Sequence, residues 1–199
     1  MCRPKDKRRL VVSAVLTVNN EQAIARVRAW IERFVVDLNL CPFARPVVSS
    51  DALRIVACQS ASPEAIATLL ITELDLLSQS SESDIATSLL VFPEGLQEFD
   101  DYLEFLDDAQ TVLEEMGLAG EIQIASFHPD YRFEGEPVGA VSHFTNRAPY
   151  PLIHLLRETM VTTALENYPN PERIPERNIK TLERLGSAGI ERLLHSLDG

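Results

Sequence analysis

The sequence is poor in cysteine and has no long apolar run, and each shortage excludes a class of protein. Of its 199 residues three are cysteines, Cys2, Cys41 and Cys58, and their number and spacing exclude the disulfide framework of small secreted domains. Charged residues or proline interrupt every apolar run before the roughly 18 residues that a membrane-spanning helix needs. The sequence therefore predicts a cytoplasmic protein that does not cross a membrane.

Positive charge is also scarce. Lysine and arginine number 18 against 30 aspartates and glutamates, which gives a formal net charge of −12. The one basic cluster lies within the first nine residues. Because a strongly acidic protein repels a phosphate backbone, we expect no nucleic-acid partner.

The N-terminal segment begins as a secretory signal does, with basic residues before an apolar run at residues 10–18. No cleavage site of the A-x-A type follows this run. We expect residues 1–19 to form a flexible basic tail. The rest of the chain, residues 20–199, has the length and apolar content of a single α/β domain.

Hydrophobic periodicity and turn residues predict alternating helices and strands. Apolar residues at three- and four-residue steps indicate helices at residues 20–40, 62–77 and 96–116, the second begun by Ser62-Pro63-Glu64 and the third closed by Gly117. Short apolar runs predict strands at residues 53–58, 88–92 and 121–127, and Val47-Val48 could pair with the first of these.

Prolines and Gly186 divide the C-terminal third into three expected helices, at residues 151–167, 175–185 and 188–197. Strands that alternate with helices favour parallel pairing through right-handed crossovers. The sequence therefore predicts an α/β fold with a small, mainly parallel sheet covered by helices and a helical C-terminal third.

The loop after the third expected strand carries the first candidate site residue. Ligands of open α/β sheets gather at the carboxyl ends of strands, and His128 leaves the strand at residues 121–127 at such an end. The loop runs to residue 148, a length common among functional loops. His128 could act as an acid/base group, or it could hydrogen-bond a carbonyl while Pro129 turns the chain.

The second candidate is the pair Asn146-Arg147, which precedes the helix expected from residue 151. A helix N-terminus favours an anion, and Arg147 could clamp a carboxylate or phosphate there. Alternatively, Asn146 caps the helix and Arg147 pairs with a surface acid. In the same helix His154 and Glu158 would share a face near Arg157, which suits a metal pair, an acid/base dyad or an ordinary salt bridge.

The third candidate is Cys41, which precedes Pro42 at the end of the first expected helix. A helix C-terminus raises the pKa of a thiol. A nucleophilic Cys41 would therefore need a nearby cation, such as His128 or Arg147. The thiol could instead be buried and inert, or it could ligate haem through the Cys-Pro motif.

Several longer segments resemble one bacterial family. They are Trp30-Ile31-Glu32-Arg33, Leu38-Asn39-Leu40-Cys41-Pro42-Phe43-Ala44, Ser126-Phe127-His128-Pro129-Asp130-Tyr131-Arg132-Phe133, Thr145-Asn146-Arg147, His154-Leu155-Leu156-Arg157-Glu158 and Ile174-Pro175-Glu176-Arg177-Asn178-Ile179. The family is uncharacterised and is catalogued as domain of unknown function 1415. The resemblance covers nearly everything after the first twenty residues.

The resemblance implies no established activity. It does imply a set of motif residues, which could share one pocket: Cys41, Pro42, His128, Tyr131, Asn146, Arg147, His154, Arg157 and Glu158. The family usually has serine after the Asn-Arg pair, where this chain has Ala148. A hydroxyl nucleophile is therefore not expected at that point.

Together these features favour a small-molecule enzyme or ligand-binding domain for an anionic substrate. The expected catalytic residues are His128, Cys41 and Tyr131, and the expected ligand-binding residues are Asn146, Arg147, Arg157 and Glu158. One alternative is a metal- or haem-binding protein, with His128, His154 and Cys41 as candidate ligands. The other is a non-catalytic adaptor, whose partner surface would comprise Arg147, Tyr150 and the acidic helix at residues 96–116.

Overall fold

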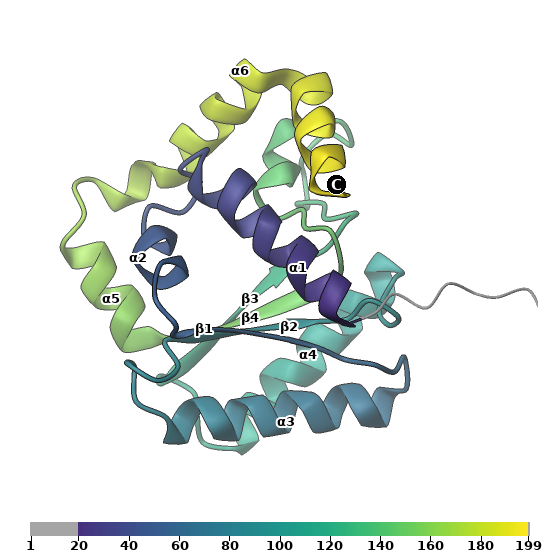
Figure 1. Cartoon of the computed structure of the whole chain (residues 1–199), viewed down its shortest axis with the longest axis vertical. Helices are drawn as coiled ribbons and strands as arrows, with labels where there is room; N and C mark the ends of the chain where they lie inside the picture. The colour runs from purple at the N-terminus through teal and green to yellow at the C-terminus, as the bar shows by residue number, and fades with distance from the viewer. Residues whose placement is uncertain (1–19, 199) are drawn as a thin grey trace, which may run out of the picture.

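A four-stranded sheet with helices packed on both faces forms the framework of the molecule (Figure 1). The computed structural model describes residues 20–198, so the tail expected at residues 1–19 lies outside the described residues. The strands are β1 (Leu53–Ala57), β2 (Thr87–Val91), β3 (Ile122–Phe127) and β4 (Leu152–Arg157), in the spatial order β1-β2-β4-β3. The first three lie where the sequence predicts strands.

The sheet is mixed, and the prediction of a mainly parallel sheet is wrong. β1 and β2 are parallel, but β4 runs antiparallel to both β2 and β3. The difference lies at Leu152–Arg157, where the sequence predicts a helix and the structure has a strand. A central strand buried on both faces is a nearly continuous apolar run, and such a run has no period that separates it from a buried helix.

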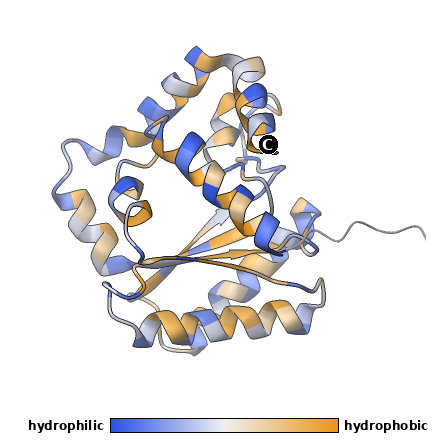
Figure 2. Cartoon of the chain, in the orientation of Figure 1, coloured by the Kyte–Doolittle hydropathy of each residue, from blue (hydrophilic) through white to orange (hydrophobic). Residues whose placement is uncertain are grey.

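Two long helices cover one face of the sheet, α3 (Pro63–Gln79) and α4 (Phe99–Glu115). α3 begins as predicted, because the Ser62 Oγ accepts a hydrogen bond from the Ala65 N–H at 3.2 Å. Gly117 follows α4 with φ of 73°, the left-handed conformation of a C-terminal cap. Figure 2 shows apolar residues along α3 and along the strands that it covers.

The opposite face is covered by helices from both ends of the described chain. They are α1 (Asn20–Trp30), which continues as a π-helical turn at Ile31–Val36, the short α2 (Ala44–Val48), α5 (Glu158–Glu166) and α6 (Ile174–His195). α6 joins the two last expected helices across a bend at Gly186, where φ is 67°. No helix within residues 20–198 combines the length and the apolar content needed to span a membrane.

The short helix α2 corrects a second prediction. Val47-Val48 belongs to α2 and does not pair with β1. Pro46 lies in the first turn of α2, where the missing N–H of proline has no intrahelical partner to lose. The two valines therefore pack against the core as helix residues.

Successive residues of each strand face opposite helix layers, as the two-residue period of a strand requires. On β4, Ile153 and Leu155 pack in the core shared with α3 and α4. His154 lies between them and points to the other face, where Thr87 of β2 lies beside it. The strands thus place polar side chains on the face covered by α1, α2, α5 and α6.

Candidate functional site

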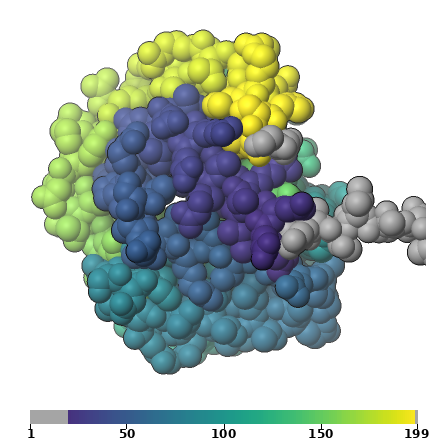
Figure 3. Space-filling view, in the orientation of Figure 1, coloured from purple at the N-terminus to yellow at the C-terminus, as the bar shows by residue number. Residues whose placement is uncertain are grey.

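A cavity of about 810 Å³ lies between the sheet and the layer formed by α1, α2, α5 and α6. Its walls are mainly apolar, with contributions from Trp30, Leu53, Leu89, Phe127, Met160 and Ile179 among others. Figure 3 shows a small opening among the purple and blue atoms of the N-terminal segments. A volume of this size falls within the roughly 300–1,000 Å³ of small-molecule sites.

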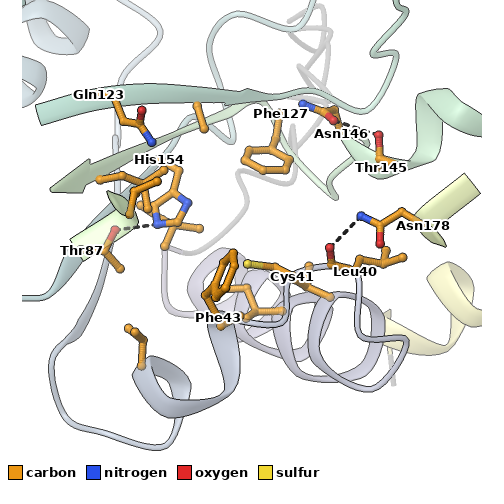
Figure 4. Close-up of a pocket in the computed structure, with 18 of the residues that line it drawn as sticks. Leu40, Cys41, Phe43, Thr87, Gln123, Phe127, Thr145, Asn146, His154 and Asn178 are labelled. Atoms are coloured by element: carbon orange, nitrogen blue, oxygen red, sulfur yellow. Dashed lines mark hydrogen bonds between the residues drawn. The ribbon is translucent and has the colours of Figure 1, made fainter. Parts of the chain in front are cut away.

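Polar groups enter the cavity from two opposite walls (Figure 4). The sheet supplies Thr87 from β2, Gln123 from β3 and His154 from β4. Cys41 and Asn178 come from the helical wall. In Figure 4 the His154 ring, the Gln123 amide and the Cys41 sulfur are directed toward the same space.

His154 is held by a short relay of hydrogen bonds. Its Nε2 lies 2.6 Å from the Thr87 Oγ1, and the same hydroxyl donates to the Leu155 carbonyl oxygen at 2.5 Å. The ring lies deep inside the protein and is partly exposed on the cavity side. Desolvation by burial lowers the pKa of His154 to about 4. The imidazole is therefore neutral at physiological pH.

Cys41 lies opposite the sheet, and its environment favours the thiol. Burial raises the pKa of Cys41, which outweighs the opposing hydrogen bonds from the backbone N–H groups of Phe43 and Ala44. Asn178 on α6 fixes this segment, because its Nδ2 donates to the Leu40 carbonyl at 2.7 Å. The site thus presents a neutral sulfhydryl to the cavity at neutral pH.

Asn146 also lines the cavity, but its amide is occupied. The Asn146 Nδ2 donates to the Ser126 carbonyl at 3.1 Å, and its Oδ1 accepts a hydrogen bond from the Thr145 hydroxyl at 2.9 Å. These contacts fasten the end of the loop at residues 128–148 to β3. The helix that the sequence predicts after Asn146 is absent, because β4 begins at Leu152.

His128 lies outside the residues that line this cavity and is fully buried. Its Nδ1 accepts from the Asp130 N–H at 3.0 Å, so its Nε2, 3.1 Å from the Leu96 carbonyl oxygen, donates to that oxygen. Burial lowers the pKa of His128. Both ring nitrogens therefore hold the loop in place. The hydrogen bond to a carbonyl is the structural role that the sequence offered as the alternative to acid/base chemistry.

Tyr131 and Arg147 lie with His128 rather than in the cavity. The Tyr131 N–H donates to the His128 carbonyl, and the Arg147 Nε donates to the Tyr131 carbonyl at 3.2 Å. The Arg147 guanidinium lies over the Phe144 ring, 4.5 Å from its centroid, beside a smaller pocket of about 210 Å³. Of the motif residues, Cys41, Asn146, His154 and Arg157 line the cavity, whereas His128, Tyr131 and Arg147 do not.

Arg157 and Glu158 do not form the helical pair with His154 that the sequence predicts. His154 and Arg157 are strand residues, and Glu158 is the first residue of α5. The Arg157 guanidinium donates to the carbonyl oxygens of Leu77 and Ser80 at the end of α3, at 2.8 and 2.7 Å. Arg157 lines the cavity, but its charge is directed at these carbonyls.

The candidate metal ligands do not converge in the described part of the chain. Within residues 20–198, no three His, Cys, Asp or Glu side chains are grouped so that they could hold a metal ion. Cys41 and His154 line the cavity, whereas His128 does not. The metal and haem alternatives remain predictions without a grouped ligand set in these residues.

Thr87 and Gln123 are site residues that the sequence does not reveal. Both lie on strands: Thr87 precedes Ser88 at the start of β2, and Gln123 is a single polar residue between two isoleucines of β3. The available signal is weak, because a polar residue in a strand usually faces solvent. Their importance follows from β4, which brings His154 between β2 and β3.

Comparison with known proteins assigns the chain to one family. The profile of the family described as protein of unknown function (DUF1415) matches residues 22–192, so the chain belongs to that family. No curated protein and no solved structure matches the chain. The resemblance drawn from the sequence motifs is therefore confirmed, and the family brings no activity with it.

Proposed function

We propose that this member of the DUF1415 family binds a small, mainly apolar organic molecule in the 810 Å³ cavity. The observation that carries the proposal is the cavity itself: it has the size of a ligand site, apolar walls and a few polar groups gathered at one place. The polar end of the ligand would lie near His154, Thr87 and Gln123, and its apolar body against the surrounding aliphatic and aromatic side chains.

The charges at the cavity favour this ligand over the anionic one that the sequence suggests. Arg147, the expected anion clamp, lies at the smaller pocket. Among the described residues that line the cavity, the one arginine or lysine is Arg157. Its guanidinium donates hydrogen bonds to carbonyl oxygens at the end of α3. Glu134 and Glu136 add negative charge at the wall. An anion would therefore meet little compensating charge.

A substitution that fills the cavity provides the test. Ala125 is paired with His154 in the β3–β4 register and lines the cavity, so Ala125→Phe places a ring in the proposed binding space. Ala67→Phe on the exposed side of α3 is the matched control. The probe is Nile red, an uncharged dye whose fluorescence rises in apolar surroundings.

We expect one Nile red molecule to bind per chain, with at least about tenfold weaker binding to Ala125→Phe and unchanged binding to Ala67→Phe. Circular dichroism and thermal unfolding would establish that both variants are folded. Equal binding by the protein and by folded Ala125→Phe would refute the cavity as the site. No binding would instead favour the adaptor alternative.

The Cys41 thiol gives an independent readout of the same site. In a Cys2→Ser background, the remaining cysteines are Cys41, which lines the cavity, and the buried Cys58. A bound molecule should slow the reaction of Cys41 with a maleimide, whereas Cys58 should react only on unfolding. Labelling of Cys41 that is insensitive to a saturating probe would contradict the proposed position of the ligand.

A further inference from the structure

We infer that His154 presents an unprotonated Nδ1 to the cavity as a hydrogen-bond acceptor, which selects ligands whose polar end is an uncharged O–H or N–H donor. The inference rests on the proposed function, because it names the chemistry of a ligand in the same cavity. It makes Thr87 a positioning residue that acts through His154.

The first step is the location of one hydrogen atom. The Thr87 Oγ1 lies 2.5 Å from the Leu155 carbonyl oxygen. Two oxygens at this separation repel unless a hydrogen lies between them, and a carbonyl has none to give. The single hydroxyl hydrogen of Thr87 is therefore directed at Leu155.

The tautomer of His154 follows from that hydrogen. Because the Thr87 hydroxyl donates its only hydrogen to the Leu155 carbonyl, it can only accept a hydrogen bond from the His154 Nε2, 2.6 Å away. Nε2 therefore carries the proton, and Nδ1 of the neutral ring keeps a free lone pair. The hydrogen bonds from His154 to Thr87 on β2 and from Thr87 to Leu155 on β4 thus fix the ring in one tautomer.

The second ring nitrogen faces the ligand space. Among residues 20–198, the hydrogen bond of the His154 ring is the one made by Nε2. Figure 4 shows the other nitrogen turned toward the cavity, with the Gln123 amide nearby on β3. A lone pair repels a carboxylate or phosphate oxygen and attracts the hydrogen of a hydroxyl or amide. A phenol, alcohol or amide on an apolar body has this chemistry.

Matched probes separate this inference from the proposed function. 4-Hexylphenol carries the donor, 4-hexylanisole replaces its hydrogen with a methyl group, and 4-hexylbenzoate carries a negative charge. In calorimetric titrations at pH 7 we expect the phenol to bind about five- to tenfold more tightly than the anisole, as one neutral hydrogen bond allows, and the benzoate to bind most weakly.

Variants then assign the preference to the relay. His154→Phe should reduce the phenol-to-anisole ratio to nearly one while the anisole still binds. Thr87→Val should reduce the ratio as well, and Thr87→Ser, which keeps the hydroxyl, should restore it. A ratio near one in the unmodified protein, or one that persists in His154→Phe, would overturn the inference alone. If neither phenol nor anisole binds, the proposed function fails.

Nitrogen NMR of imidazole-labelled protein tests the tautomer without a ligand. At pH 7 the chemical shifts of the resonances lost in His154→Gln should report a protonated Nε2 and an unprotonated Nδ1. Thr87→Val should change this pattern, and Thr87→Ser should keep it. The opposite assignment in the unmodified protein would overturn the inference even if ligands bind.

Discussion

Acid should destabilise the protein through His154, and the size of the effect follows from its environment. Burial lowers the pKa of this histidine from its ordinary value of 6.5 to about 4 in the folded chain. The unfolded chain therefore takes up a proton on His154 at a higher pH than the folded chain does. The contribution of the neutral His154 to the free energy of unfolding is fully present above pH 6.5 and is lost as the pH falls toward 4.

The linkage relation gives the magnitude. With those two pKa values, the loss is about 2 kcal/mol at pH 5 and about 3 kcal/mol at pH 4. Protonation would place a positive charge on a ring shielded from water, and the desolvation of that charge is the physical origin of the cost. For a domain of ordinary stability this is a substantial share of the free energy of unfolding.

Urea unfolding of the protein and of His154→Gln, measured between pH 7 and pH 4, isolates the contribution. The variant keeps an N–H that can donate to Thr87 and cannot titrate. We expect the stability of the unmodified protein, relative to the variant, to fall by about 2 kcal/mol between pH 7 and pH 5. His195→Gln, at an exposed histidine, is the control and should leave the pH dependence unchanged.

The burial of His128 also lowers its pKa, so it acts in the same direction in both proteins and cancels in the comparison. Parallel stability curves for the protein and His154→Gln over this range would show that His154 is not held neutral. That result would refute the desolvated environment assigned to the ring.

Two further substitutions test the framework around the site. Tyr102→Phe should lower the free energy of unfolding, measured in urea, by about 2 kcal/mol. The buried hydroxyl donates to the Leu152 carbonyl at 2.8 Å and accepts from the Phe127 N–H at 2.9 Å, so both backbone groups would lose a partner. A loss below about 0.5 kcal/mol, which is typical of a surface substitution, would contradict this prediction. Arg54→Ala should cost about 2 kcal/mol or more, because it leaves the carboxylate of Glu73, which is 2% exposed, without its two hydrogen bonds of 2.7 and 2.8 Å. Glu73→Gln should restore part of that loss in the Arg54→Ala background, and no restoration would refute the buried charge as the cause.

Local signals in the sequence predict most elements of the fold. Ser62 and Gly117 mark helix ends through their own hydrogen-bonding and backbone preferences, so neighbouring residues suffice to place α3 and α4. β4 is different, because its identity as a strand depends on partners far away in the chain. The run at residues 152–157 carries no period that distinguishes a strand buried on both faces from a helix.

The candidate site shows the same limit. Four of the predicted candidates line the cavity, namely Cys41, Asn146, His154 and Arg157. Cys41 follows a well-predicted helix, whereas Asn146 precedes a predicted helix that the structure replaces with β4. His128, Tyr131 and Arg147 meet one another beside the cavity instead. The anion site predicted at Arg147 depended on a helix N-terminus, and the structure replaces that helix with β4. No argument from nearby residues could have supplied that strand.

β4 lies between β2 and β3 in the sheet but comes last of the four strands in the sequence. The sheet is therefore completed late in synthesis of the chain. When residues 20–151 have left the ribosome, β2 and β3 still lack the strand that joins them. The contact between Thr87 and His154 spans 67 positions along the chain, so the polar wall of the cavity exists only after β4 has paired. Ligand binding would therefore indicate that all four strands have paired. A chain cut before β4 would lose the site together with its central strand.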